Sequence, residues 1–264
     1  MGSDRDSHPI GVFDSGVGGL SILKALRAAL PAEDFVYLAD TGYAPYGERG
    51  DAYVIQRTRA IVRQLRDEHA IKLLVIGCNT ATAVAIHLAR NEHPDLPMVG
   101  VEPALKPAVA LSRTRRIGVL ATRGTLASGK FRDLHGTLRG QAEFVLQPCD
   151  GLADAIENHD APGIAALCAR YARALGELGT RAGQIDTVVL GCTHYAFARS
   201  ELAARAGPGV RLIETGEPVA RQTRRLLEAA GQLRAGETGT FQLLSTGSLP
   251  ALQAAAARWL PLRA

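Results

Sequence analysis

The feature that most constrains the fold of this chain is a regular alternation of short apolar runs with longer amphipathic segments. Runs such as "IGVF", "FVYLA", "LLVIG" and "VVLG" are rich in Val, Ile and Leu, and helix-like segments separate them. Strands that are buried on both faces have continuous apolar sequences, and the crossover helices of parallel sheets are amphipathic. The alternation therefore predicts an α/β fold with parallel sheets.

The pattern occurs twice along the chain. "IGVFDSG" begins at Ile10 and "IGVLATR" at Ile117, while "LLVIGCNTAT" carries Cys78 and "TVVLGCTHYA" carries Cys192. The two pairs have similar separations, which predicts two α/β domains of similar topology. We expect residues 8–103 and 213–264 to form the first domain and residues 104–212 the second. The segment from "VRLIETG" onward is then expected to complete the first domain.

The polar residues of the repeated motifs follow predicted strands. Ligands of open parallel sheets bind beyond the carboxyl ends of the strands, and "DSG", "ADT…PYG", "GCNT" and "GCTH" occupy such ends. If the two domains face each other, both cysteines reach one cleft. The sequence therefore predicts an active site in the inter-domain cleft.

The four cysteines divide into two kinds. A thiol at a strand end that opens a helix lies near free N–H groups, which favour the thiolate. Cys78 and Cys192 share this context, so we interpret them as reactive. Cys149, in "LQPCDG", and Cys168, in a predicted helix, are interpreted as small buried packing residues.

Composition narrows the possible functions. Of the 264 residues, 47% are hydrophobic and 21% charged, and no apolar run is long enough to span a membrane. The polar start "MGSDRDSHP" lacks the apolar core of a secretory signal, so a soluble cytoplasmic protein is expected. The net charge of +4 comes from arginines spread over helix faces, so no nucleic-acid partner is required. There is no C-x-x-C pair and no G-x-G-x-x-G fingerprint, so we expect neither a metal nor another cofactor.

The polar neighbours of the two thiols suggest what they act on. Asn79 and Thr80 at a helix start suit a carboxylate, and His194 is placed to assist proton transfer at Cys192. Asp14 and Ser15 are suited to binding an ammonium group or to pairing with a thiol. Two thiols without a cofactor fit proton exchange at a carbon atom, with a base on one face and an acid on the other.

Five motifs, in order along the chain, resemble the glutamate racemase family of the aspartate/glutamate racemase superfamily. They are "GVFDSGVGGLSIL", "YLADTGYAPYGER", "VIGCNTATA", "GVEPALKPAV" and "VVLGCTHYAFA". The resemblance implies cofactor-independent interconversion of L- and D-glutamate, with D-glutamate used for peptidoglycan. It also implies two facing α/β domains with the active site between them, and a homodimer.

The resemblance also assigns residues to roles. It implies that Cys78 and Cys192 are the two acid/base groups, with assistance from Asp14 and His194. The implied substrate contacts are Asp14, Ser15, Tyr46, Gly47, Asn79, Thr80, Thr193 and His194. Glu102 matches an acidic position near the family's site, with a less definite role. The chain departs from the family pattern at Gly50, Ala196 and Glu214, where Ser, Pro and Asp are common.

Three other functions remain open from the residues alone. One is a sister enzyme acting on aspartate or a related acidic substrate, although two thiols argue against a one-cysteine decarboxylase. A cysteine hydrolase would use one nucleophile, Cys192 with His194, and leave "GCNT" unexplained. A two-domain binding module would bind an amino acid and exchange no proton.

Overall fold

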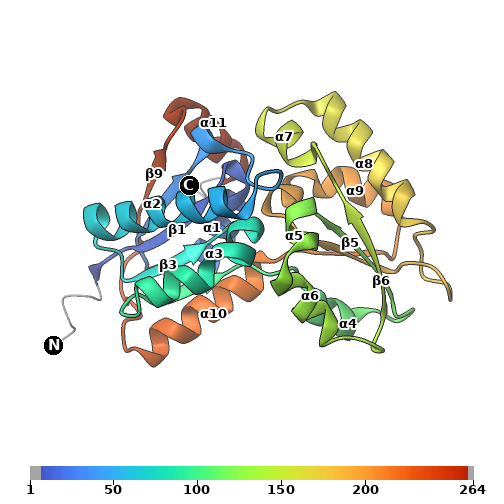
Figure 1. Ribbon diagram of the computed structural model, residues 1–264, viewed down its shortest axis with the longest axis horizontal. Helices are drawn as coiled ribbons and strands as arrows, with labels where there is room; N and C mark the ends of the chain where they lie inside the picture. The colour runs from blue at the N-terminus through green and yellow to red at the C-terminus, as the bar shows by residue number, and fades with distance from the viewer. Residues whose placement is uncertain (1–6, 261–264) are drawn as a thin grey trace. The chain divides into compact units, whose positions relative to one another are not determined.

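The computed structural model describes residues 7–260 and divides the chain into two compact units. The first comprises the residues up to Val101 and from Gly216 onward, and the second is Glu102–Thr215. In Figure 1 the blue, cyan and red elements belong to the first unit. The boundaries thus fall after 101 and 215, where the sequence predicted 103 and 212, and residues 261–264 lie outside the described part.

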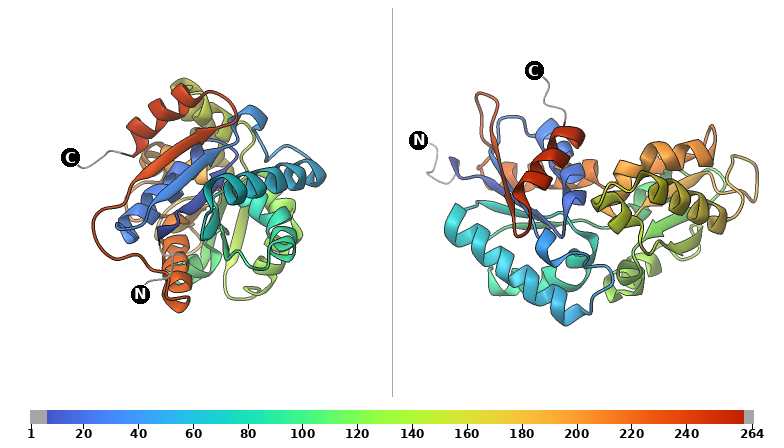
Figure 2. Two further views of the ribbon diagram at one scale, coloured as in Figure 1. Left: turned by 90° about the vertical axis from the view of Figure 1, so that its left-hand side faces the viewer. Right: turned by 90° about the horizontal axis from the view of Figure 1, so that it is seen from above.

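The first unit is built on a parallel sheet with the strand order β4-β3-β1-β2-β9. Its strands are β1 (Ile10–Asp14), β2 (Phe35–Ala39), β3 (Leu73–Ile76), β4 (Met98–Gly100) and β9 (Phe241–Ser245). Every residue of β1, β2 and β3 is buried, as their continuous apolar sequences predict. The edge strand β9, red beside the blue β2 in Figure 2, is partly exposed.

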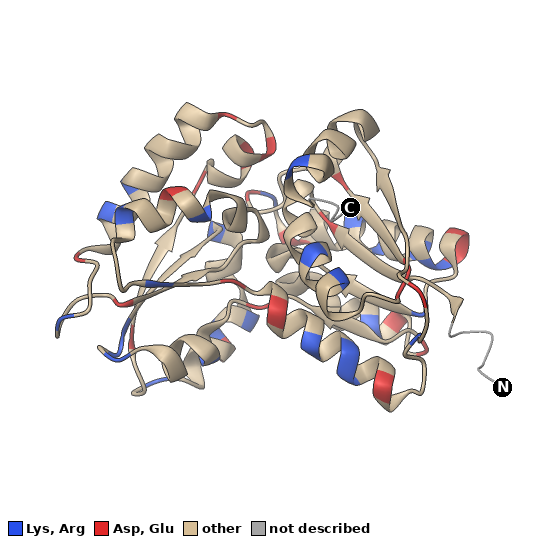
Figure 3. Ribbon diagram, turned by 180° about the vertical axis from the view of Figure 1, so that it is seen from behind, with Lys and Arg blue, Asp and Glu red and all other residues tan. Residues whose placement is uncertain are grey.

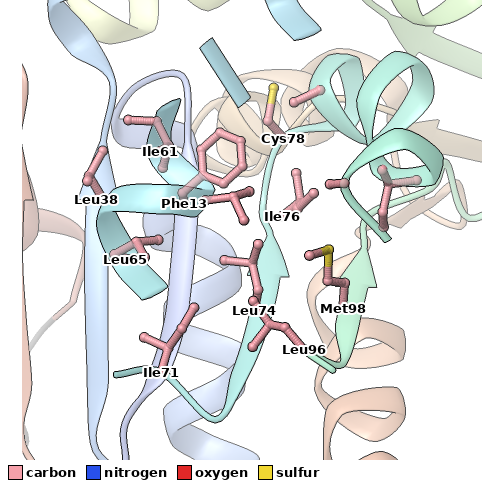
Figure 4. Close-up of a cluster of buried hydrophobic side chains, with 14 of the residues drawn as sticks. Phe13, Leu38, Ile61, Leu65, Ile71, Leu74, Ile76, Cys78, Leu96 and Met98 are labelled. Atoms are coloured by element: carbon pink, nitrogen blue, oxygen red, sulfur yellow. The ribbon is translucent and has the colours of Figure 1, made fainter. Parts of the chain in front are cut away.

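Helices cover this sheet because their apolar residues recur along one face. They are α1 (Leu20–Ala29), α2 (Asp51–His69), α3 (Asn79–Glu92), α10 (Gly216–Ala229) and α11 (Leu249–Trp259), with short 3₁₀ turns η2 (Val17–Gly19) and η3 (Thr41–Tyr43). α2 packs with α3, and α1 packs with α10. Figure 4 shows the core between α2, α3 and the sheet, with Cys78 just beyond Ile76 at the end of β3.

The second unit has its own parallel sheet with the order β6-β5-β7-β8. Its strands are β5 (Arg116–Ala121), β6 (Glu143–Pro148), β7 (Thr187–Leu190) and β8 (Arg211–Ile213). Its helices are α4 (Leu105–Leu111), α5 (Arg123–Ala127), α6 (Gly129–Gly136), α7 (Leu152–Glu157), α8 (Ala161–Leu175) and α9 (Arg199–Ala206), with a 3₁₀ helix η4 (Thr193–Ala198). The central strand β7 is fully buried, whereas the edge strands β6 and β8 are partly exposed.

The two sheets share one topology. If β1, β2, β3 and β4 are matched to β5, β6, β7 and β8, the orders β4-β3-β1-β2 and β8-β7-β5-β6 coincide, and β9 is an addition to the first sheet. The prediction of two parallel α/β domains of similar topology is therefore confirmed. Cys78 follows β3 and Cys192 follows β7, so the two cysteines occupy equivalent places in the two sheets.

One assignment from the sequence is wrong. "VRLIETG" was expected to begin the return to the first domain, yet its strand β8 pairs with β7, Thr187 opposite Arg211, and extends the second sheet. β8 is the counterpart of β4 in the repeated topology. The return therefore begins only at α10, after Thr215.

Charged residues of both signs are interspersed along the helices. Figure 3 shows Lys and Arg next to Asp and Glu on the same helices, and several pairs one turn apart form ion pairs, such as Arg205 with Glu201 and Arg221 with Glu217. This agrees with the interpretation of the arginines as solvated helix faces. No helix within residues 7–260 combines the length and the hydropathy that crossing a membrane requires.

Candidate active site

The first unit brings Asp14, Ser15 and Cys78 together at the carboxyl ends of β1 and β3. The sulfur of Cys78 lies 3.8 Å from the hydroxyl oxygen of Ser15. The Asp14 carboxylate accepts hydrogen bonds from the N–H of Gly16 at 2.9 Å and from the Ser15 hydroxyl at 3.3 Å. All three site residues are buried. The Cys78 thiol thus contacts the Ser15 hydroxyl, and Asp14 is connected to it through Ser15.

The glycines that follow Asp14 allow close packing around it. A Cβ atom on Gly19 would lie 2.5 Å from Cβ of Asp14 and 2.8 Å from the Tyr37 hydroxyl. That hydroxyl donates to the carbonyl of Gly16 at 2.6 Å. Because Gly19 lies against the Asp14 side chain, the "DSGVGG" segment fixes the end of β1.

Cys78 is the residue from which α3 begins. Its backbone is extended, and its carbonyl accepts the N–H of Thr82 at 2.9 Å. The thiol therefore lies at the positive end of a helix of 14 residues, as the sequence predicted. Thr80, in the first turn, is buried as well.

Asn79 is the least satisfied polar residue of this region. Its side chain is buried, with 4% exposed, and neither its Oδ1 nor its Nδ2 has a hydrogen-bond partner among the described residues. Leaving a buried amide unpaired costs about 1–3 kcal/mol. An amide without a protein partner beside a helix N-terminus is suited to hydrogen-bonding a polar or anionic group.

Tyr46 and Gly47, in the loop after β2, differ in their exposure to solvent. Tyr46 is fully buried, and its hydroxyl donates to the carboxylate of Asp40. Burial, reinforced by this hydrogen bond, raises the pKa of Tyr46 far above its ordinary value. Gly47 is partly exposed. The side chain of Tyr46 is thus committed to Asp40, and any contact of Tyr46 with a ligand is left to its backbone.

The second unit holds a thiol, an imidazole and a carboxylate in a row. The sulfur of Cys192, at the end of β7, lies 3.8 Å from Nδ1 of His194, and Nε2 of His194 lies 2.7 Å from the carboxylate of Glu157. Cys192 and His194 are buried, and the Glu157 side chain is 19% exposed. This order is the arrangement in which a carboxylate orients an imidazole toward a sulfur.

The environment of His194 favours its charged form. Burial alone would lower the pKa of the imidazole, but hydrogen bonds to Cys192 and Glu157 outweigh it and raise the pKa well above the usual value. The second unit therefore places a positively charged imidazole beside the sulfur of Cys192.

Sequence reasoning missed Glu157. It is the last residue of α7, a short helix that the apolar pattern did not reveal, and it lies 37 positions before His194. The only available signal was an acidic residue after an apolar stretch, "LADAIE", which is common on solvated helices.

The segment after Cys192 is also different from expectation. It is the 3₁₀ helix η4, and an α-helix begins only at Arg199. Ala196, where the family usually has Pro, lies within η4, and Thr193 is buried at its start. The helix-dipole effect at Cys192 is accordingly weaker than at Cys78, and the His194–Glu157 pair supplies the positive charge instead.

The two remaining cysteines are interior residues. Cys149 and Cys168 are buried in the same apolar cluster of the second unit, and burial raises the pKa of both thiols, that of Cys168 to about 11. All four cysteines are free thiols. Burial agrees with the interpretation of Cys149 and Cys168 as packing residues, although Cys192 belongs to the same cluster.

Three further sequence positions lie outside these clusters of polar contacts. Glu102 forms an ion pair with Lys130 at 2.8 Å and is 46% exposed. Glu214 pairs with Arg199 at 2.9 Å. Gly50 precedes α2, and a Cβ atom there would meet nothing within 4 Å, so the serine common in the family would fit.

Two parallel α/β units, each with a buried thiol at an equivalent strand end, define a racemase-like class of protein. Residues 10–223 match the model of the Asp/Glu/Hydantoin racemase family, and the chain belongs to that family. The prediction of a racemase enzyme is thereby confirmed.

The individual relatives are glutamate racemases. The chain is 49% identical to the glutamate racemase of Methylococcus capsulatus over 86% of this chain and 82% of the relative. It superposes with a TM-score of 0.85 on a glutamate racemase isoform of Bacillus anthracis, at 29% identity, covering 97% and 95% of the two chains. The Escherichia coli glutamate racemase, solved with L-glutamate and the activator UDP-MurNAc-ala, gives a TM-score of 0.81 at 32% identity, covering 96% and 95%. The resemblance stated from the motifs is confirmed.

Proposed function

We propose that this protein is a glutamate racemase that interconverts L- and D-glutamate by proton transfer between two thiols and the α-carbon. The observation that carries the proposal is the repetition of a buried cysteine after β3 and after β7, at equivalent places in two like sheets. The family and the glutamate racemases to which the chain is similar support the substrate and the reaction.

In the proposed reaction the two thiols act on opposite faces of one α-carbon. One cysteine, as thiolate, takes the α-proton, so the C–H bond breaks, an S–H bond forms, and the electron pair remains on the substrate. The other cysteine, as thiol, then delivers its proton to the opposite face and becomes the thiolate. A single base would return the proton to the face from which it came, so inversion requires both groups.

Each unit prepares its thiol by different means. Cys192 has the protonated His194, which Glu157 holds in place. Cys78 lies at the N-terminus of α3, and its thiol donates to the hydroxyl oxygen of Ser15, which in turn donates to Asp14. The helix N-terminus at Cys78 and the imidazolium at Cys192 are the groups that favour a thiolate when either cysteine acts as the base.

The polar residues around the thiols are assigned to the substrate. The unpartnered amide of Asn79 and the first turn of α3 suit a carboxylate of glutamate. The proposed contacts are Asp14, Ser15, the backbone of Tyr46 and Gly47, Asn79, Thr80, Thr193 and His194. No cofactor or metal takes part in the proposed reaction.

The biological setting belongs to the same proposal. D-glutamate formed in the cytoplasm would supply peptidoglycan synthesis, and the active form would be a homodimer. These statements follow from the resemblance to the glutamate racemases, whose motifs extend over essentially the whole chain.

Circular dichroism tests the proposed activity directly. Protein dialysed against a chelator is incubated with L-glutamate and no added cofactor, and the optical signal should decay to zero. D-glutamate should reach the same endpoint, and aspartate should give a kcat/KM at least about a hundredfold lower, since a few kcal/mol of transition-state binding separate the two substrates. Activity that needs added metal or pyridoxal phosphate would contradict the proposal, as would equal rates for aspartate.

The row formed by Cys192, His194 and Glu157 is also the geometry of a cysteine hydrolase. Such an enzyme would form an acyl-enzyme on Cys192, detectable by mass spectrometry. A stable optical signal from glutamate together with an acylated Cys192 would favour this second function.

A further inference from the structure

The loop of residues 41–47, which carries Tyr46 and Gly47, is held by Asp40, a residue of the "ADT…PYG" motif to which the family resemblance assigns no role. Asp40 follows the carboxyl end of β2, beside Asp14 at the carboxyl end of β1. The N–H of Asp40 donates to the carbonyl of Asp14 at 2.9 Å. Its side chain is completely buried. A buried carboxylate is stable only when it is paired and hydrogen-bonded, so its partners show what it does.

The carboxylate of Asp40 accepts four hydrogen bonds from three side chains. Arg57, on α2, donates through Nε and Nη2, each at 2.9 Å. The hydroxyl of Thr246, which follows β9, donates at 2.8 Å, and the hydroxyl of Tyr46 donates to the other carboxylate oxygen. Both oxygens are thus occupied, which leaves Asp40 unsuited to binding substrate or to transferring a proton.

The partners of Asp40 also hold the loop at other points. The guanidinium of Arg57 lies 3.4 Å from the ring centre of Tyr43, and the hydroxyl of Thr246 accepts the N–H of Gly42 at 3.2 Å. The backbone approaches closely there, because a Cβ atom on Gly42 would lie 2.8 Å from the Thr246 carbonyl oxygen. The start, middle and end of the loop are therefore tied to the Asp40 network.

The loop presents backbone donors that the protein does not use. The N–H groups of Tyr46 and Gly47 donate no hydrogen bond to any residue within 7–260. A carboxylate of the substrate is the acceptor that such groups bind well, provided that the loop holds them in place.

We propose that Asp40 is a positioning residue that, with Arg57 and Thr246, fixes the loop of residues 41–47 so that its backbone N–H groups bind glutamate. This inference rests on the proposed function. Thr246, far along the chain and near its end, thereby acts on substrate binding through Asp40.

A matched pair of variants tests the proposal. Thr246→Val removes the hydroxyl that donates to Asp40 and accepts the N–H of Gly42, and keeps the shape of the side chain. Thr240→Val removes a similar bond, 2.9 Å to Asp34, at the other end of β9. We measure kcat, KM, melting temperature and hydrogen–deuterium exchange of the peptide that contains residues 41–47.

Thr246→Val should raise KM for both enantiomers at least about fivefold with kcat changed less than about twofold, since a bond to a charged group is lost. Exchange in residues 41–47 should become faster. Tyr46→Phe should do the same, and the double variant should raise KM by less than the product of the single effects, because both act through Asp40. Thr240→Val should leave KM and the exchange of the loop at the parent values.

Every other pattern contradicts the proposal. An unchanged KM in Thr246→Val, a raised KM without faster loop exchange, or an equal rise in Thr240→Val would each overturn it. A fall in kcat without a rise in KM in Thr246→Val would also overturn the proposal. A parent protein that did not racemise glutamate would overturn the proposed function instead, and loop exchange would still decide whether Asp40 holds the loop.

Discussion

His194 is the residue at which the chemistry of the second unit is set. Its imidazole lies between the sulfur of Cys192 and the carboxylate of Glu157, and these two hydrogen bonds overcome the effect of burial on its pKa. The charged form of His194 therefore persists to higher pH than for a free histidine. In the proposed mechanism this positive charge lies beside the sulfur that exchanges the proton.

Replacing the carboxylate should shift the pH at which His194 loses its proton. Glu157→Gln removes the negative charge, so the pKa of His194 falls and the imidazolium is lost at a lower pH. The high-pH limb of kcat/KM for L-glutamate should move to lower pH, and kcat/KM at pH 8 should fall at least about tenfold. Steady-state racemisation across a pH series measures both effects.

Glu143→Gln is the control for that series. Glu143 is an exposed glutamate of the same unit that pairs with Arg116, and its replacement should leave the pH profile unchanged. If Glu157→Gln kept the parent profile, Glu157 would not control the charge of His194.

Side chains at strand ends were largely predictable from the sequence, whereas their supporting partners were not. Cys78, Asp14 and Ser15 follow apolar runs whose ends can be read directly, and the structure places them together. Glu157 is brought to His194 by tertiary structure, and nothing in the local pattern around it identifies it as a partner. Asp40 lies within the "ADT…PYG" motif, only six positions before Tyr46, but its hydrogen bonds to Arg57 and Thr246 depend on the tertiary structure.

At the scale of elements, the alternation of buried strands with amphipathic helices was predicted, whereas four of the short helices were not identified. α2 and α3 have apolar faces long enough to show a helical period. α4, α5, α7 and α9 are one or two turns long, too short for a period to be distinct. The sequence of β8 indicated a strand, but a strand of three residues carries too little pattern to predict which sheet it joins.

Asp186 ties the connection before β5 to the start of β7. Its carboxylate accepts from the Ser112 hydroxyl at 2.6 Å and from the N–H groups of Arg113 and Thr114 at 2.7 and 3.1 Å. Burial would raise the pKa of Asp186, but these hydrogen bonds lower it to about 2. The charged form of Asp186 is therefore the one that stabilises the connection to β5 and the start of β7.

Asp186→Asn should lower the free energy of unfolding of the second unit by about 2 kcal/mol at pH 7, the equivalent of the pKa shift. Because the folded-state pKa is depressed, the parent has this stabilisation above the unfolded value near 3.8 and loses it as the pH falls toward 2. The gap in melting temperature between parent and variant should accordingly narrow below about pH 4.

Asp133→Asn, at an exposed position on α6, provides the comparison for Asp186→Asn. It should change the melting temperature little at any pH. If the difference in melting temperature between the parent and Asp186→Asn stayed constant down to pH 2, the negative charge of Asp186 would not be what stabilises the fold.

On the scale of the whole molecule, the repeated topology explains why one chain carries two such cysteines. The order of four strands is the same in both units, and each unit contributes a thiol beyond its equivalent strand. The proposed mechanism uses this repetition, because inversion at carbon needs two groups of the same kind. Each must serve as base in one direction and as acid in the other.

The most direct test of the two-thiol mechanism separates the halves of the reaction with enantiomers of a β-chloro analogue of glutamate. Abstraction of the α-proton expels chloride from such a compound, so no proton is needed from the opposite face. The proposed mechanism, by resemblance to the family, assigns the D-enantiomer to Cys78 and the L-enantiomer to Cys192. Cys78→Ala should therefore eliminate chloride from the L-analogue only, and Cys192→Ala from the D-analogue only, while neither variant racemises glutamate.

Cys168→Ala, which removes a buried packing thiol, should retain racemisation and act on both analogues. Chloride release by each variant from each enantiomer is the decisive measurement. Opposite preferences in the two cysteine variants are the predicted result. The same preference in both variants, or racemisation by Cys78→Ala near the parent rate, would contradict the account.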